Sequence, residues 1–138
     1  MPQARKSGIL LAAAFLLGLL PAAAPSFAHH SFAAEFDQKK PVKVQGVVTS
    51  MRWSNPHAWL YLDAKEPDGS VAHWGFELGG LNQLYRQGWR KEDLPPGTAV
   101  TVEAFLSKSD PHVANLQTIT LSDGRQLLSG PKADAAAH

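Results

Sequence analysis

The sequence predicts a mainly β fold: a small five- to six-stranded Greek-key barrel of the OB type, with one short helix between strands three and four. Short Val-rich segments alternate apolar and polar residues, and turns rich in Gly, Pro and Asp separate them. Gly46 falls in the middle of the first segment, where a long strand must bend to serve both sides of a barrel. A β-sandwich is the alternative, but it usually needs about seven strands.

Strands and turns can be placed along the chain from this pattern. The predicted strands span residues 41–53, 57–65, 70–78, 99–106 and 112–121, with a short sixth segment at 125–128. Helical spacing of apolar residues predicts a helix over 81–87, which Gly88 ends, and one further turn at 91–94. In the first strand, alternation places Val44 and Val48 on one side and Val47, Thr49 and Met51 on the other.

Residues 1–28 have the three parts of a secretory signal. Arg5 and Lys6 give a positive start, residues 8–20 form an uncharged apolar run of 13 residues, and Ser26-Phe27-Ala28 supplies small residues at −3 and −1. A membrane anchor needs about 20 apolar residues, so this run is too short. We expect cleavage between Ala28 and His29 and a periplasmic or secreted protein. A cut after Ala24 also fits the small-residue rule.

The mature chain is expected to consist of an extended N-terminal arm (29–40), the barrel domain (41–129) and a disordered tail (130–138). The chain has no Cys, which excludes disulfides and thiolate chemistry and leaves core packing to hold the domain together. Loss of the signal leaves 11 Lys and Arg against 12 Asp and Glu, a formal charge of −1. We therefore expect no nucleic-acid partner and no stable membrane anchor after cleavage.

Five stretches carry a resemblance to a known family: HHSFAAEFD, PVKVQGVVTSMRWSNPHAWLYLD, WGFELGG, LYRQGW and LPPGTAVTV. Together they resemble DUF6152, a family of bacterial exported domains of unknown function, over about residues 29–128. The resemblance implies export and a common fold, and it implies no reaction. It marks as motif positions His29, His30, Asn55, Pro56, His57, Glu77, Gly88 and Trp89.

Four histidines form a candidate copper site. Cleavage after Ala28 would place the α-amine and imidazole of His29 on one residue, where together they can chelate a metal ion. A third nitrogen from His57 or His112 would complete a set that suits Cu(II), with His30 beside it. The strand order predicts both loop histidines at one end of the barrel, within reach of the arm. Alternatively, His30 caps the arm, His57 satisfies backbone groups of its turn, and any metal binding is incidental.

The aromatic residues are candidates for a stacking platform. Trp59 and Tyr61 share the side of their strand opposite Leu60, where they could stack on sugars, bases or heterocycles. The alternative is that most of the tryptophans fill the core, Trp74 and Trp89 above all.

Catalytic signatures are weak. Asp63 and Glu77 lie on the outer faces of neighbouring predicted strands, and acid–base chemistry would need them close together. Glu77 is instead expected to form an ion pair with Arg52, Arg86 or Arg90. The sequence has no Gly-rich phosphate loop, nucleophile elbow or recognisable Ser-His-Asp spacing.

These observations predict an exported, non-catalytic binding or accessory domain whose partner is an unknown periplasmic protein or small ligand. The candidate binding residues are Asn55, His57, Trp59, Tyr61 and Glu77. One alternative is a copper-binding protein that uses His29 with His57 or His112. The other is a metal-dependent enzyme, for which so small a barrel leaves little room beyond one open face.

Overall fold

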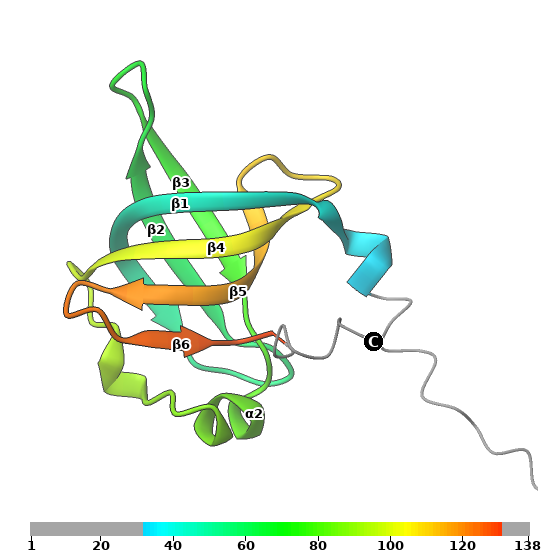
Figure 1. Cartoon of the computed structure of the whole chain (residues 1–138), viewed down its shortest axis with the longest axis vertical. Helices are drawn as coiled ribbons and strands as arrows, with labels where there is room; N and C mark the ends of the chain where they lie inside the picture. The colour runs from blue at the N-terminus through cyan, green and yellow to red at the C-terminus, as the bar shows by residue number, and fades with distance from the viewer. Residues whose placement is uncertain (1–31, 131–138) are drawn as a thin grey trace, which may run out of the picture.

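The structure is a computed structural model that describes residues 32–130. After a helical turn at 32–35, the elements are β1 (Phe36–Arg52), β2 (Trp59–Lys65), β3 (Val71–Glu77), α2 (Leu81–Arg86), the 3-10 turn η1 (Lys91–Asp93), β4 (Ala99–Ser107), β5 (Val113–Leu121) and β6 (Gln126–Leu128) (Figure 1). The predicted signal segment, His29, His30 and the tail from 131 onward lie outside the described residues, so the expectations about them stay predictions.

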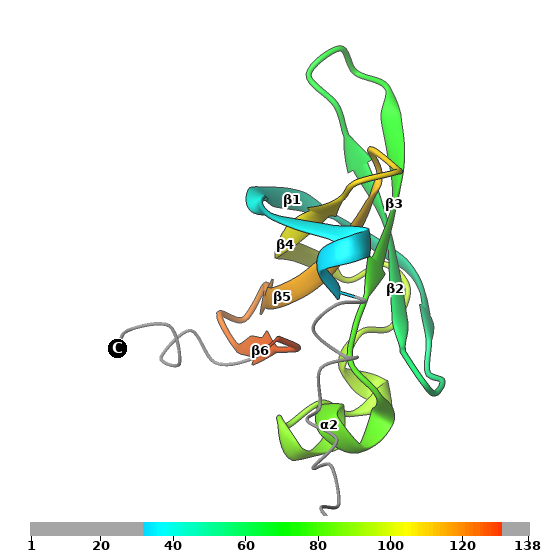
Figure 2. The ribbon, with the colours of Figure 1, turned by 90° about the vertical axis from the view of Figure 1, so that its right-hand side faces the viewer.

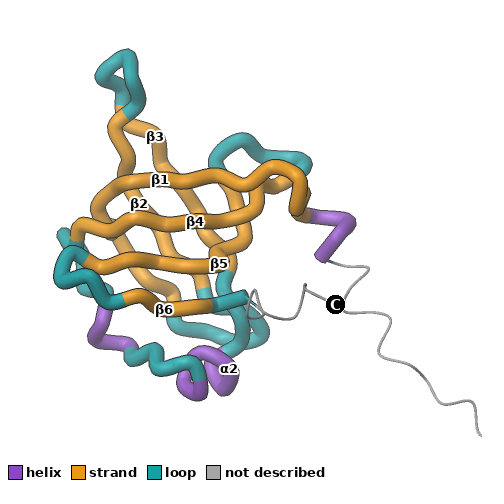
Figure 3. The backbone as a smooth tube through the Cα atoms, viewed as in Figure 1, coloured by secondary structure: helices purple, strands orange, loops and turns teal. Residues whose placement is uncertain are grey.

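Five strands close into a ring. β1 pairs antiparallel with β2 and with β4, β2 pairs with β3, and β4 pairs with β5. A parallel pairing of β3 with β5 completes the ring, and β6 adds to β5 (Figures 1 and 3). This is the connectivity of a Greek-key barrel of the OB type, with α2 in the predicted position between β3 and β4. The predicted mainly β fold is confirmed.

The alternation of β2 and β3 divides them between a core and an outer face. Leu60, Leu62 and Phe76 are almost completely buried, whereas Trp59 and Tyr61 are only partly buried on the other side. The hairpin of β2 and β3 rises beyond the ring, and α2 lies at the opposite end (Figure 2). Within residues 32–130, no helix is both long and apolar enough to cross a membrane.

The ring closes where β1 bends at Gly46. β1 pairs with β4 from Phe36 to Val47 and with β2 from Val47 onward, so it changes partner next to this glycine. A Cβ at Gly46 would lie 2.5 Å from the carbonyl oxygen of Asp63 on β2. The absence of a side chain therefore lets the two backbones approach closely at the position where the sequence predicted a bend.

A bulge at Thr49 corrects the prediction for Met51. The register of β1 against β2 shifts between Val48 and Ser50, so Thr49 is an extra residue. The extra residue reverses the alternation beyond it, and Met51 turns to pack against the core instead of facing away from it.

Only the second part of the described arm is extended. Residues 32–35 are helical, and β1 begins at Phe36, five residues before the predicted strand. Phe36 is buried and Phe32 packs on both Phe36 and Phe105, with ring centroids 5.5 and 6.5 Å apart. Pairing of Phe36 with Ser107 on β4 explains the earlier start. At the other end, Gly130 is buried and accepts a hydrogen bond from Gln87 Nε2, so the expected tail does not begin at 130.

Substitution of Gly46 tests this closure. Gly46→Ala places a methyl group inside contact distance of the Asp63 backbone, and we expect the free energy of unfolding in urea to fall by about 3 kcal/mol. Gly75→Ala is the matched control on β3, because its Cβ would meet Tyr61 Cε1 at an ordinary 3.5 Å. We expect this control to stay within about 1 kcal/mol of wild type. Equal stability of the two variants would contradict the role of Gly46.

Candidate functional site

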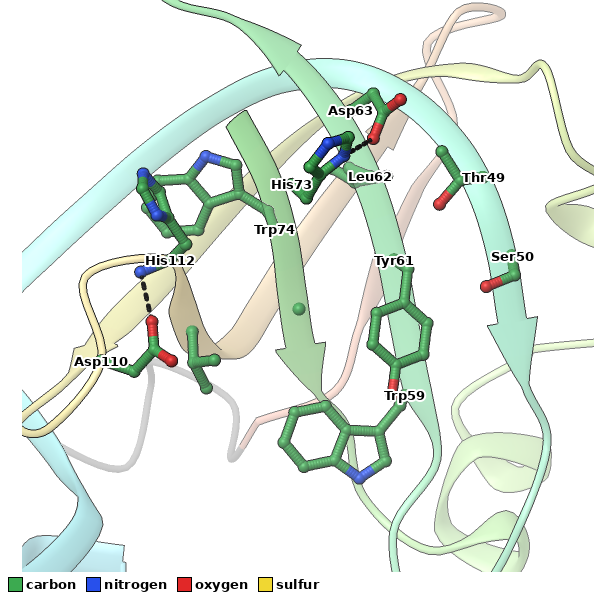
Figure 4. Close-up of a pocket in the computed structure, with 12 residues that line it drawn as sticks. Thr49, Ser50, Trp59, Tyr61, Leu62, Asp63, His73, Trp74, Asp110 and His112 are labelled. Carbon is green, nitrogen blue, oxygen red and sulfur yellow. Dashed lines mark hydrogen bonds and ion pairs between the residues drawn. The ribbon is translucent and has the colours of Figure 1, made fainter. Parts of the chain in front are cut away.

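An open groove of about 780 Å³ crosses the outer face of β2 and β3 (Figure 4). Its floor is a row of four residues paired from strand to strand: Ser50 on β1, Tyr61 on β2, Gly75 on β3 and Val113 on β5. The groove therefore spans four strands of the sheet, and Trp59, Tyr61 and Asp63 line it along β2. Its volume lies in the usual range for small-ligand sites.

Trp59 and Tyr61 form an aromatic platform in this groove. Their ring centroids are 6.4 Å apart and their planes differ by 16°, and Figure 4 shows the two rings side by side. Both rings lie over Gly75, where a Cβ would be 3.5 Å from Tyr61 and 3.9 Å from Trp59. These are ordinary van der Waals distances, so the rings would also accommodate an alanine at this position. Arg52 adds its guanidinium 5.9 Å from the centre of the Trp59 ring.

Two carboxylate–imidazole pairs flank the platform. Beyond Tyr61, His73 Nδ1 lies 2.6 Å from Asp63 Oδ1, across the β2–β3 ladder. Beyond Trp59, His57 Nδ1 lies 3.3 Å from Glu77 Oε1. The Glu77 side chain is only 12% exposed, whereas the His57 ring is about half exposed. Each pair fixes one ring nitrogen and leaves Nε2 as the atom able to reach a ligand.

Burial raises the pKa of Glu77 above its usual range. The nearby His57 acts in the opposite direction, and the carboxylate of Glu35 raises the pKa further. This effect of Glu35 means that the helical turn at 32–35 lies close enough to the His57–Glu77 pair for the two carboxylates to repel.

Asn55 has a structural partner. Its Oδ1 accepts a hydrogen bond of 2.9 Å from the N–H of Leu81 at the start of α2. The peptide bond between Asn55 and Pro56 is cis, and Gly80 packs against both residues. The Asn-Pro-His segment thus docks the β1–β2 loop onto α2, and of its three residues only His57 reaches a groove-side carboxylate.

His57 and His112 do not lie at one end of the barrel. Arg52 pairs with Trp59 at one end of β1, and Phe36 pairs with Ser107 at the other. The loops that carry the two histidines therefore extend from opposite ends of this strand, because β4 runs antiparallel to β1 (Figures 1 and 2). The His112 ring packs edge-on against Trp74 at 5.2 Å, and the backbone N–H of His112 donates to Asp110 Oδ1. Among residues 32–130, no three His, Asp or Glu side chains are grouped to hold a metal ion.

The other sequence expectations have mixed outcomes. Trp89 is fully buried, as predicted, and its Nε1 donates to the carbonyl of Leu128. Trp74 is only partly buried and lines the groove as well as packing on the core. Glu77 pairs with His57 and not with an arginine, since Arg52 lies over Trp59 and Arg90 over Tyr85.

Several groove residues were not found from the sequence. Ser50, Gly75 and Val113 enter the groove through strand pairing, and Thr49 enters at the β1 bulge and Asp110 from the loop before β5. Only Gly75 carried a signal, as a glycine on the outer side of a strand otherwise filled by larger residues.

Fold and groove together define a small barrel domain with an open, aromatic-floored face. The chain matches the family described as "Family of unknown function (DUF6152)" over residues 16–114. This match covers most of the chain, and the protein belongs to this family. No curated protein matches the chain.

The pH dependence of stability tests the environment of Glu77. Because its pKa is raised in the folded protein, the folded chain binds more protons than the unfolded chain above the ordinary glutamate pKa, and wild-type stability falls as pH rises through this window. The Glu77→Gln variant has no carboxyl group at this position, so its stability does not fall with pH for this reason. We therefore expect the free energy of unfolding of the variant, relative to wild type, to improve from about pH 4 to about pH 7 in urea titrations. Glu103→Gln, at an exposed glutamate on β4, is the control. A relative stability that worsens or stays flat would contradict the assignment.

Proposed function

We propose that this chain is an exported, non-catalytic binding domain whose ligand lies in the groove over β2 and β3. The observation that carries the proposal is the Trp59–Tyr61 platform, held flat over Gly75 and flanked by two carboxylate–imidazole pairs. Large aromatic rings normally contribute to core burial, so two parallel rings kept on an open face favour contact with a ligand. The OB-type barrel uses this same face of strands 2 and 3 for binding. Export rests on the signal-like residues 1–28.

Titration followed by amide NMR tests the groove as the binding site. The mature chain is titrated with a panel of neutral oligosaccharides, a short oligothymidylate and choline. We expect saturable shifts confined to the groove, at residues 49–50, 59–63, 73–75 and 110–113, for at least one probe. Trp59→Ala should weaken that binding at least about tenfold, because stacking on one aromatic ring contributes about 1–3 kcal/mol.

Tyr85→Ala is the matched control, since Tyr85 is an exposed aromatic on α2 away from the groove. Affinity equal to wild type is expected for it. Saturable shifts centred elsewhere, or no shifts from the whole panel, would overturn the groove as the binding site.

A second candidate function is copper binding through the mature N-terminus. The observation that favours it is the His57–Glu77 pair, in which a nearly buried carboxylate holds Nδ1 and directs Nε2 outward. Metal-binding histidines usually have such a carboxylate partner. Among the two loop histidines, this favours His57 over His112, whose ring packs on Trp74.

Copper titration of the exported chain tests this second candidate. Mass spectrometry first establishes that the chain begins at His29. We expect one-to-one Cu(II) binding that one extra N-terminal residue abolishes, and that Glu77→Gln weakens about 10- to 100-fold. His73→Ala, which removes the other carboxylate-paired imidazole, should leave the affinity unchanged. Binding that ignores both the extension and the Glu77 substitution would retire the site.

A further inference from the structure

We infer that the groove binds an uncharged oligosaccharide chain that lies across the strands. This inference rests on the proposed function and names the ligand class of the same site. Three properties of the groove favour such a ligand: the flat aromatic floor, the charges around it and the hydrogen-bonding groups at its edges.

The floor suits a ring that stacks by its face. The ring planes of Trp59 and Tyr61 differ by 16°, and the ring centroids are 6.4 Å apart. The two rings therefore form one extended surface with no slot between them. The negative face of an aromatic ring attracts the weakly positive C–H groups on the face of a pyranose. A nucleic-acid base could also stack here, and the surrounding charges distinguish the two.

Those charges disfavour a phosphate backbone. Among the described residues that line the groove, none is Lys or Arg, while Asp63 and Asp110 both line it. Glu77 lies beside Trp59 as its cross-strand partner. The guanidinium of Arg52 is a nearby cation, and it lies over the Trp59 ring, so a sugar that stacks on this ring has to displace it. Proteins that bind single-stranded nucleic acids use a positively charged groove. The groove described here has no such positive charge along its lining.

The edges of the groove suit hydroxyl groups. Carboxylates accept hydrogen bonds, imidazoles both donate and accept, and the hydroxyls of Thr49 and Ser50 do both. Asp63 is already paired with His73, so its charge is partly offset and a cationic ligand gains less from it. A ligand with many hydroxyls and no charge satisfies this mixture better than a cation or an anion.

The groove also suits a chain longer than one sugar. Its floor extends from Ser50 on β1 across to Val113 on β5, and it is open along the outer face of the sheet. We therefore expect affinity to increase with chain length up to several sugar units, as each added ring reaches a further strand.

The panel of titrations above distinguishes this inference from the proposed function. The sugars are cellohexaose, chitohexaose and maltohexaose, each with its disaccharide, and are tested up to about 10 mM to detect binding with a Kd near 1 mM. We expect at least one hexaose to bind the groove, more tightly than its disaccharide, with little change when salt is raised. Trp59→Ala should weaken this binding at least about tenfold, Trp59→Phe should weaken it severalfold, and Tyr85→Ala should have no effect.

If Trp59→Ala is unstable, Trp59→Phe serves as the second variant, because it keeps an aromatic ring at this position and should still weaken binding severalfold. Groove shifts from oligothymidylate or choline, with none from any hexaose, would overturn the sugar assignment and leave the groove as a binding site. No groove shifts from any probe would overturn both proposals. Hexaose binding unaffected by both Trp59→Ala and Trp59→Phe would overturn the assignment to this groove.

Discussion

The close approach of β1 and β2 at Gly46 is the constraint on which the rest of this structure depends. β1 has to pair with β4 over its first half and with β2 over its second, and only a residue without a side chain fits beside the Asp63 carbonyl. The bend closes the ring, which brings the start of β5 against β3. It also holds the β2 backbone at Asp63, the residue whose carboxylate pairs with His73 at the edge of the groove. Barrel closure and groove geometry therefore share one backbone contact.

The face patterns of single strands could be read from the sequence. Alternation in β2 and β3 placed Leu60 and Phe76 in the core and Trp59 and Tyr61 outside, and Gly46 indicated the bend. These are local features, because a residue's neighbours in the chain decide which face it occupies. Where the pattern failed, a partner strand was responsible. The extra residue at Thr49 turns the Met51 side chain to the other face of β1. This bulge is defined by the pairing of β1 with β2, so the sequence of β1 alone does not show it.

Which residues line the groove depends even more strongly on pairing between strands that are distant in the sequence. Asp110 and Val113 reach the groove because β5 joins β3 in parallel, which no pattern in either segment reveals. The expectation for the two loop histidines failed for a related reason. The loops after the first and fourth strands flank one face of this barrel type, but the antiparallel pairing of β1 and β4 places them at opposite ends of β1. Sharing a face therefore does not bring His57 and His112 together.

The motif positions shared with the family divide into two groups in the structure. Asn55 docks a loop onto α2, Gly88 ends that helix with a positive φ of 94°, and Trp89 fills the core beneath β6. These residues are explained by folding alone and require no ligand. His57 and Glu77 are different, because a nearly buried carboxylate with an imidazole partner costs desolvation energy that a hydrophobic pair would avoid. A site that needs the carboxylate or the imidazole accounts for this cost, and the pair lies beside the aromatic platform, where a ligand in the groove would meet it.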